Sequence, residues 1–264
     1  MGRGWWVGVA ALACACDPFT SEGASRDAGA SDGSADGPIG SDAGGGGGGD
    51  GGGRFCQRAQ ASEVLFCEDF EGSATAPRYG FAEVEIFGPS MTATLTDDPA
   101  RGRVLSVEAA KVAPQSRSLR LVAAFPKAGH VRLSYELRVV SAKLNYFTPA
   151  TFRGANAVQS QSDELGVAVY GRGSAWDLVG ASTRRAPPTP PDGWHHVDYE
   201  AMVGPGSFTT SVAVDGRPLG ERTSKSVDDL ALFDARVGLF YTSADPPDES
   251  AVVYLDDVIV RKLP

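Results

Sequence analysis

Residues 130–139 read His-Val-Arg-Leu-Ser-Tyr-Glu-Leu-Arg-Val, an uninterrupted alternation of polar and apolar side chains. Because successive side chains of a β-strand point to opposite faces of the sheet, this stretch predicts a strand with one buried and one polar face. The same period of two recurs in residues 194–203 and 208–215. Such stretches predict a sheet that packs a core with one face and meets water with the other.

Shorter β-type runs follow one another along the rest of the chain, and turn-forming Asp, Gly and Pro residues separate many of them. These runs are residues 64–70, 83–87, 91–95, 104–108, 118–123, 166–170, 176–179, 236–242 and 251–260. Residues 226–233 alone have a period near that of a helix, which predicts one short helix at most. About a dozen strands without crossover helices predict an all-β fold, a two-sheet antiparallel β-sandwich of the jelly-roll type over residues 55–264.

Residues 1–16 have the layout of a secretory signal peptide: one basic residue, an apolar stretch and small residues at the end. The closing Ala13-Cys14-Ala15-Cys16 resembles the lipobox of bacterial lipoproteins, which implies a lipid on Cys16 or Cys14. That family prefers Leu three residues before the cysteine, and neither cysteine has one, so an ordinary cleaved signal stays open. We expect an exported protein, extracellular or held in the cell envelope as an outer-membrane lipoprotein, with a lipid anchor as its membrane contact.

Residues 17–54 consist mainly of Gly, Ala, Ser and Asp, with seven acidic residues against two arginines. Such a segment buries too little apolar surface to offset the entropy of ordering it, so the composition predicts a disordered linker. The whole chain has a net charge of −9. Because phosphate backbones are bound by a surplus of Lys and Arg, this acidity argues against a nucleic-acid partner.

Two further cysteines, Cys56 and Cys67, open the folded region. In an exported chain they predict a disulfide, which would contribute about 2–3 kcal/mol by the loop-entropy model. A metal site would need more Cys or His residues at ligand spacing, and the separation of these two cysteines is not such a spacing.

Three ordered motifs connect the folded region to a known family. They are Phe66-Cys-Glu-Asp-Phe-Glu-Gly72, then Gly193-Trp-His-His-Val-Asp-Tyr199 with Ser211-Val-Ala-Val-Asp-Gly216, and Val253-Tyr-Leu-Asp-Asp-Val-Ile-Val260. Together they resemble the concanavalin A-like lectin/glucanase superfamily, which includes laminin-G-like modules and β-glucanases. The resemblance covers residues 66–260 and implies a jelly roll whose first and last strands are neighbours.

The resemblance also implies a possible metal ion. Neighbouring first and last strands would concentrate the acidic residues Glu68, Asp69, Glu71, Asp256 and Asp257 in one patch. Many members of the superfamily hold a structural calcium ion with a last-strand carboxylate and oxygen atoms near the first strand. Carried over, the ligands are Asp256 and Asp257 with Glu71 and Gly72 as their counterpart, oxygen donors that suit calcium. The alternative is a solvated acidic edge that discourages aggregation between strands.

The glucanase members carry two catalytic carboxylates on a Glu-x-Asp-x-x-Glu strand. Laid from Glu164, the second and third acidic positions fall on Gly166 and Val169, so the pair is missing. We also find no match to the alginate-lyase set of an Arg-rich strand, a Gln-x-His element and a Tyr-containing C-terminal strand. Asp198 and Glu200 remain as an acid/base pair, but a polar strand face open to water explains them without catalysis.

Without catalytic groups, the concave face of the sandwich becomes a recognition surface, where aromatic platforms and neighbouring polar groups bind sugars. The candidate ligand-binding residues are Tyr170, Arg172 and Trp176, with Tyr146 and Trp194 next. The alternative is that Trp176 and Trp194 pack in the core, which we predict for Trp194. We therefore predict a non-catalytic module that binds glycans or another surface ligand. Two alternatives stay open: a divergent polysaccharide-degrading hydrolase or lyase, and a structural or adhesive domain without a small ligand.

Overall fold

The computed structural model describes residues 54–59, 63–71, 80–88, 90–110, 117–142, 146–158, 160–163, 167–170, 175–178, 192–241 and 250–264. These residues belong to one compact unit, Gly49–Pro264. The predictions for residues 1–16 and 17–53, lipidation of Cys14 or Cys16 included, lie outside the described residues. No helix in the described part is long and apolar enough to cross a membrane.

The larger sheet runs in the order β13-β12-β11-β6-β15-β4-β3, and β1 also pairs with β15. Its eight strands are β1 (Val64–Glu68), β3 (Met91–Asp98), β4 (Gly102–Ala109), β6 (His130–Ala142), β11 (Trp194–Gly204), β12 (Ser207–Val214), β13 (Arg217–Lys225) and β15 (Ala251–Lys262). Each pairing is antiparallel.

The smaller sheet runs in the order β10-β9-β7-β14-β5-β2, and β8 also pairs with β7. Its seven strands are β2 (Glu83–Phe87), β5 (Arg117–Ala128), β7 (Tyr146–Ala155), β8 (Ser160–Asp163), β9 (Val167–Tyr170), β10 (Ala175–Leu178) and β14 (Ala231–Tyr241). These pairings are antiparallel too. The two sheets confirm the predicted all-β sandwich, and one short helix, α1 (Arg54–Arg58), precedes β1.

The core lies between the sheets and follows the alternation of the sequence. In β6 the five apolar residues from Val131 to Val139 are at most 1% exposed, and the polar residues between them face outward. From the other sheet, the ring of Phe152 lies 4.7 Å from the ring of Tyr199 in β11. Each such fully buried side chain contributes about 1.5–3 kcal/mol of hydrophobic stabilisation.

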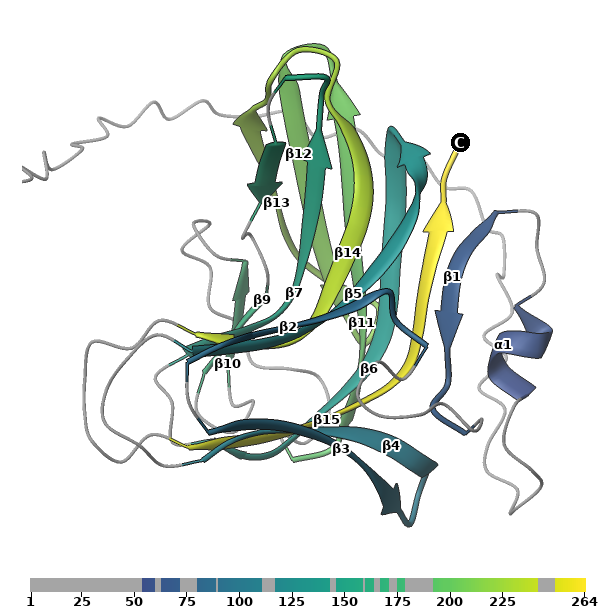
Figure 1. The fold of residues 1–264 in the computed structure, drawn as a ribbon, viewed down its shortest axis with the longest axis vertical. Helices are drawn as coiled ribbons and strands as arrows, with labels where there is room; N and C mark the ends of the chain where they lie inside the picture. Colours follow the sequence, from purple (N-terminus) through teal and green to yellow (C-terminus); the bar gives the residue numbers. More distant parts are fainter. Residues whose placement is uncertain are drawn as a thin grey trace, which may run out of the picture. The chain divides into compact units, whose positions relative to one another are not determined.

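Both sheets bend strongly between their upper and lower halves, as Figure 1 shows. The eight-stranded sheet follows the outer side of this bend and the seven-stranded sheet the inner side. The outward face of the seven-stranded sheet is therefore the concave face of the sandwich, and the outward face of the eight-stranded sheet is the convex face.

The last strand pairs with the first, as the resemblance implies. The first half of β15 pairs with β4 and the second half with β1, and the switch falls at Asp256 and Asp257. The pairing of β15 with β6 has a bulge at the same point, where Asp257 takes a left-handed backbone conformation (φ 49°). A bulge adds an unpaired residue and redirects the strand. Both aspartates therefore lie at the point where β15 stops pairing with β4 and begins to pair with β1.

One local prediction, the burial of Trp194 in the core, is wrong. Residues 226–233, where the pattern allows one short helix at most, form none, because a turn with left-handed Asp229 (φ 56°) leads directly into β14, which begins at Ala231. Trp194 is not in the core, since β11 places it on the convex face, half-buried, while the next residue, His195, is fully buried. The indole N–H of Trp194 donates to Asp98 at 3.4 Å.

Candidate functional site

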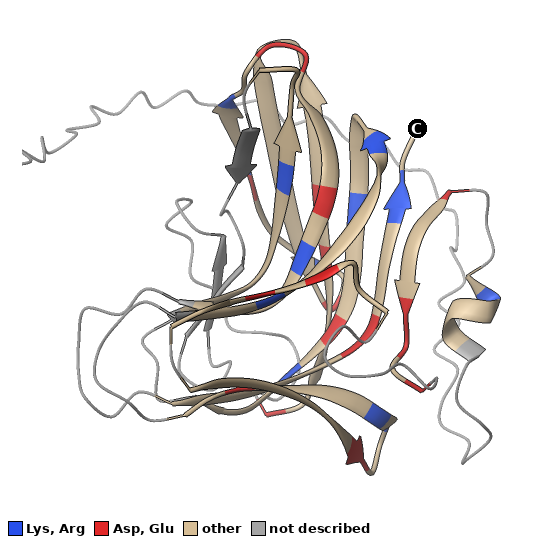
Figure 2. Ribbon diagram, in the orientation of Figure 1, with Lys and Arg blue, Asp and Glu red and all other residues tan. Residues whose placement is uncertain are grey.

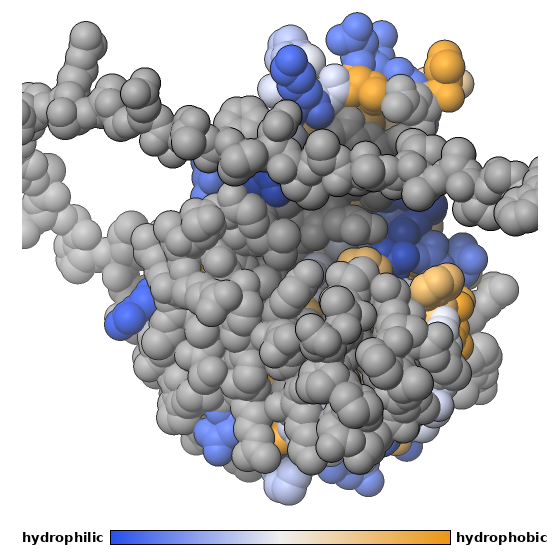
Figure 3. Space-filling model, turned by 90° about the vertical axis from the view of Figure 1, so that its left-hand side faces the viewer, coloured by the Kyte–Doolittle hydropathy of each residue, from blue (hydrophilic) through white to orange (hydrophobic). Residues whose placement is uncertain are grey.

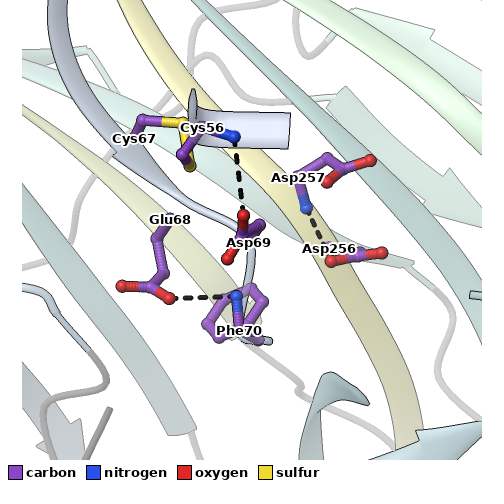
Figure 4. Close-up of a disulfide and its surroundings, with 7 residues drawn as sticks. All are labelled: Cys56, Cys67, Glu68, Asp69, Phe70, Asp256 and Asp257. Atoms are coloured by element: carbon purple, nitrogen blue, oxygen red, sulfur yellow. Dashed lines mark hydrogen bonds between the residues drawn. A yellow bond between two sulfur atoms is a disulfide. The ribbon is translucent and has the colours of Figure 1, made fainter. Parts of the chain in front are cut away.

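The predicted disulfide between Cys56 and Cys67 is present and joins α1 to β1. Figure 4 shows it beside the segment that follows β1, where the N–H of Cys56 donates to Asp69 at 3.4 Å. The N–H of Phe70 donates to the Glu68 carboxylate at 2.9 Å. The disulfide therefore holds the short helix against the strand that opens the acidic patch.

The acidic patch at the β15 bulge contains a built-in cation, Arg101 from the turn between β3 and β4. Its Nη1 lies 3.0 Å from Asp257 Oδ2 and 3.7 Å from Asp256 Oδ2, and its Nη2 lies 2.8 Å from Glu136 Oε2. Burial and the neighbouring charge of Asp257 raise the pKa of Asp256 to about 8. Glu136 also pairs with His196 at 3.0 Å. Among the described residues, Arg101 is the one cation in an ion pair with Asp256 or Asp257, so negative charge is in excess there when both aspartates are ionised.

This excess of negative charge favours a cation, but the described donors alone do not complete a calcium site, which takes six to eight oxygen atoms. Among the described residues, no group of three or more His, Cys, Asp or Glu is arranged to hold a metal ion. Glu71 accepts a hydrogen bond from the N–H of Arg103 at 2.9 Å, and Gly72 lies outside the described residues. Calcium bound by Glu71, Gly72, Asp256 and Asp257 stays a prediction.

The four predicted ligand-binding residues are placed only by the register of their strands. Tyr146 pairs with Tyr170, and Trp176 pairs with Val169, on the neighbouring strands β7, β9 and β10 of the seven-stranded sheet. The side chains of these residues, and Arg172 entirely, lie outside the described part of the chain. Their contact with a ligand therefore stays a prediction.

The described part of the concave face carries a row of alternating charges that the sequence did not single out. It runs Arg153, Asp234, Arg236, Glu85, Arg120, and we call it the arginine–carboxylate row. Figure 2 shows basic and acidic segments side by side on β7, β14 and β2. The Nε of Arg153 donates to Asp234 at 2.8 Å, and the Nη2 of Arg236 lies 3.0 Å from Glu85 Oε1. The row closes with Arg120 Nη2 at 3.4 Å from Glu85 Oε2.

Strand register assembles this row from four separate strands. In β14 the inward residues Ala235, Val237 and Leu239 are buried in the core, so the residues between them face outward. Asp234 pairs with Arg153 of β7, and Glu85 of β2 pairs with Arg120 of β5. Opposite charges on directly facing positions stabilise a sheet, and these pairings place both signs across the concave face.

Aromatic rings flank the row at both ends. The guanidinium of Arg153 lies over the ring of Phe233 at 4.8 Å, and that of Arg120 lies over Phe240 at 5.1 Å. Phe87, at the end of the edge strand β2, is 64% exposed and pairs with Ser118, which pairs in turn with Phe240. Figure 3 turns the left-hand side of Figure 1 toward the viewer and shows hydrophilic and apolar side chains next to one another where the residues are not drawn in grey.

The two central residues of the row, Asp234 and Arg236, are charged but buried. Asp234 is 1% exposed, and this burial outweighs the attraction of Arg236 and Arg153 and raises the pKa of its carboxyl group. The side chain of Arg236 is 7% exposed, and its Nε and Nη2 form ion pairs but no hydrogen bond within the described chain. Buried donors normally find an acceptor, so the centre of the row has hydrogen-bonding capacity to offer a ligand.

The described charged side chains of the concave face form a network of ion pairs. All three histidines of the chain, His130, His195 and His196, lie on β6 and β11 of the other sheet. Each of the two carboxylates of the row is in ion-pair contact with two arginines. A row of fixed charges beside aromatic rings can orient a polar ligand through hydrogen bonds and stacking.

Asp198 and Glu200, the carboxylates considered as an acid/base pair, lie on the convex face. Burial raises their pKa values, but hydrogen bonds from His196 and Ser134 to Asp198 outweigh it, and those from Arg132 and His130 outweigh it at Glu200. Both pKa values are lowered as a result, so both groups stay ionised. A general acid of a glycosidase instead needs a raised pKa, so the pair behaves as a satisfied polar strand face.

No protein-family model matches this chain, and no curated protein matches its sequence. Among solved structures it is similar to the alginate lyase vAL-1 from Chlorella virus, with 11% identity and a TM-score of 0.48 over 76% of this chain and 100% of that one. It is similar to a polysaccharide lyase family 7 alginate lyase, AlgAT5, with 10% identity and a TM-score of 0.45 over 75% and 92%. The CBM22-1 xylan-binding domain of Xyn10C from Paenibacillus barcinonensis gives 12% identity and a TM-score of 0.38 over 77% and 100%. The assignment of this chain as a jelly-roll β-sandwich follows from its own strand pairing.

Proposed function

We propose that this chain is an exported, non-catalytic carbohydrate-binding protein whose ligand lies across the concave face of the seven-stranded sheet. The observation that carries the proposal is the arginine–carboxylate row with exposed Phe87 at its edge. Sugar rings offer apolar faces for stacking on aromatic side chains and hydroxyl groups for hydrogen bonds to charged planar groups. The concave face presents both kinds of partner on neighbouring strands.

Non-catalytic binding is favoured over hydrolysis or elimination by the same residues. Glu85 and Asp234 are each held between two arginines, and no histidine lies on the strands of this sheet. A polysaccharide-degrading enzyme would need a titrating acid or base within reach of the ligand. Release of sugar fragments by the purified chain would establish the enzyme instead.

Export and anchoring belong to the proposal as well. Residues 1–16 supply the signal, with a lipid on Cys16 or Cys14, and the linker 17–54 separates the sandwich from the membrane. The disulfide between Cys56 and Cys67 supports an oxidising compartment outside the cytoplasm. The partners would then be glycans at or outside the cell surface, with the lipid as the one membrane contact.

The test is binding of the full chain to an array of polysaccharides and oligosaccharides, with fragment release measured on every glycan that binds. The Phe87→Ala variant removes the exposed ring, and we expect it to weaken binding by about tenfold, since stacking of this kind is worth about 0.5–1.5 kcal/mol or more. Val140→Ala is the matched control, because Val140 is an exposed apolar residue (41%) on β6 of the other sheet. Equal binding by both variants, or no glycan binding at all, would refute the proposal.

A further inference from the structure

We propose that the glycan bound on the concave face carries ionised carboxylate groups, as a polyuronate does, and that Arg236 is the residue that selects them. This inference rests on the proposed function and names the class of its ligand. The alternatives are a neutral glycan, for which the arginines would act only as hydrogen-bond donors, and a row that serves stability alone.

Arg236 has no carboxylate to itself. The row has three guanidiniums and two carboxylates, and both carboxylates beside Arg236 are shared. Asp234 lies between Arg153 and Arg236, and Glu85 lies between Arg236 and Arg120. A carboxylate of the ligand would give Arg236 a partner that it does not share, and a neutral ligand would not.

The Arg236 guanidinium at the centre of the row has donor groups that lack a hydrogen bond. Its side chain is more than nine-tenths buried, yet Nε and Nη2 form no hydrogen bond within the described chain. Nε lies 3.4 Å from Asp234 Oδ1 and Nη2 lies 3.0 Å from Glu85 Oε1, so both contacts are ion pairs with poor hydrogen-bond geometry. A planar guanidinium matches a carboxylate with two parallel N–H donors, a geometry that neither neighbouring carboxylate supplies.

Aromatic rings hold the two outer arginines of the row in place. Arg153 and Arg120 lie over the rings of Phe233 and Phe240, which cover one face of each guanidinium. Stacked arginines are held in place before a ligand arrives, so less side-chain entropy is lost when they form hydrogen bonds. Fixed charges on three neighbouring strands, β7, β14 and β5, suit a polymer that repeats its charge along its length.

The experiment compares acidic polysaccharides with their own neutral forms. Each polyuronate, for example polygalacturonate, is tested beside the same backbone with its carboxyl groups methyl-esterified, by calorimetry with the full chain. We expect the tightest ligand to be an acidic form, esterification to lower its affinity by about tenfold or more, as the loss of one charge-assisted hydrogen bond does, and added salt to weaken it further. An esterified form that binds as tightly as the acid would overturn the inference.

Variants of the row test whether its arginines cause the preference for acidic glycans. Arg236→Lys keeps the charge but loses the two-pronged donor, so we expect acid binding to fall about tenfold and the binding of esterified forms to stay unchanged. Arg217→Gln, an exposed arginine at the start of β13 on the other sheet, is the control and should leave both unchanged. Where Arg236→Lys melts earlier than the parent, Arg153→Gln at the half-buried end of the row gives the same comparison.

The outcomes separate the two proposals. Binding of neutral glycans alone, with Arg236→Lys equal to the parent, refutes the acidic ligand and leaves the carbohydrate-binding function standing. Binding of no glycan in either form refutes the proposed function and this inference with it. Preference for acidic forms that Arg236→Lys and Arg153→Gln leave intact refutes the role of the row.

Discussion

Arg101 offers the sharpest test of how the β15 bulge is held together. Its guanidinium lies within 3.0 Å of Asp257 and Glu136 and within 3.7 Å of Asp256. Replacing it in the variant Arg101→Gln keeps a side chain of similar length and removes the charge. Asp256 and Asp257 then lose their cation at the point where β15 leaves β4 and joins β1. Within the described chain, Glu136 keeps only His196, 3.0 Å away.

The magnitude follows from burial. A charge pair at about 3 Å is worth roughly 5 kcal/mol at an effective dielectric constant of 20, and desolvation offsets most of it. Arg101 is 26% exposed and Asp256 6%, so the cost lies between about 1 kcal/mol for an exposed pair and about 3–5 kcal/mol for a buried one. We expect about 2–3 kcal/mol, which lowers the Tm of a domain of this size by roughly 4–10 °C.

Thermal unfolding of the full chain, followed by circular dichroism at low salt, measures the effect. Arg101→Lys retains the charge and should lose less than half as much stability as Arg101→Gln. Arg217→Gln on β13 is the control for removal of an exposed arginine and should melt with the parent. A Tm for Arg101→Gln equal to that of Arg217→Gln would show that the carboxyl groups of the bulge need no counter-charge and would refute the reasoning.

Three further predictions concern pH, packing and metal. Hydrogen bonds to Asp198 and Glu136 raise the pKa of His196 to about 10, so its stabilising contribution is complete below the usual pKa near 6.5 and is lost as the pH rises through about 10. An NMR titration of its ring with a midpoint near 6.5 would contradict this. Gly238 in β14 has φ 148°, and a Cβ there would collide with the carbonyl oxygen of Leu119, so Gly238→Ala should destabilise by about 2–4 kcal/mol in urea titrations. If calcium binds at the acidic patch, EDTA lowers the Tm and added Ca²⁺ restores it, whereas an unchanged Tm rejects the ion.

The alternation of polar and apolar residues predicted most of the strands, because a strand with one buried face needs an apolar side chain at every second position. Residues 130–139 and 194–203 form core-facing strands with the predicted faces, and the predicted neighbours at the termini pair as β1 and β15. The error at Trp194 is instructive, since its position in that alternation is shared with His196 and Asp198 on the polar face. The period of two places Trp194 on the polar face, as observed, whereas the general tendency of Trp to be buried places it in the core. The period is the better guide here, because a shift of one residue in register moves a side chain to the opposite face.

The candidate site could not be found in the same way. The arginine–carboxylate row joins Glu85 to Arg236, residues about 150 positions apart, and brings in Arg120 and Arg153 from two more strands. Each charge alone is an ordinary outward residue of a strand, so a single-strand pattern gives no sign of the row. The weak signal was the pair Asp234 and Arg236, two charges inside the otherwise apolar strand β14. Only the pairing of four strands turns these residues into one surface.

The two outward faces differ in how their charges are satisfied, and this difference indicates which face binds. On the convex face the carboxylates of Glu200 and Asp98 each have an arginine partner: Glu200 has Arg132, and Asp98 has Arg138 at 2.8 Å. On the concave face three arginines share two carboxylates, and the buried donors of Arg236 form no hydrogen bond in the described chain. Paired surface charges contribute little to stability or affinity, whereas buried donors without an acceptor gain from a ligand that supplies one. A ligand that balances charge and hydrogen bonds together therefore gains more on the concave face, so Glu200→Gln should leave glycan binding unchanged while Arg236→Lys weakens it.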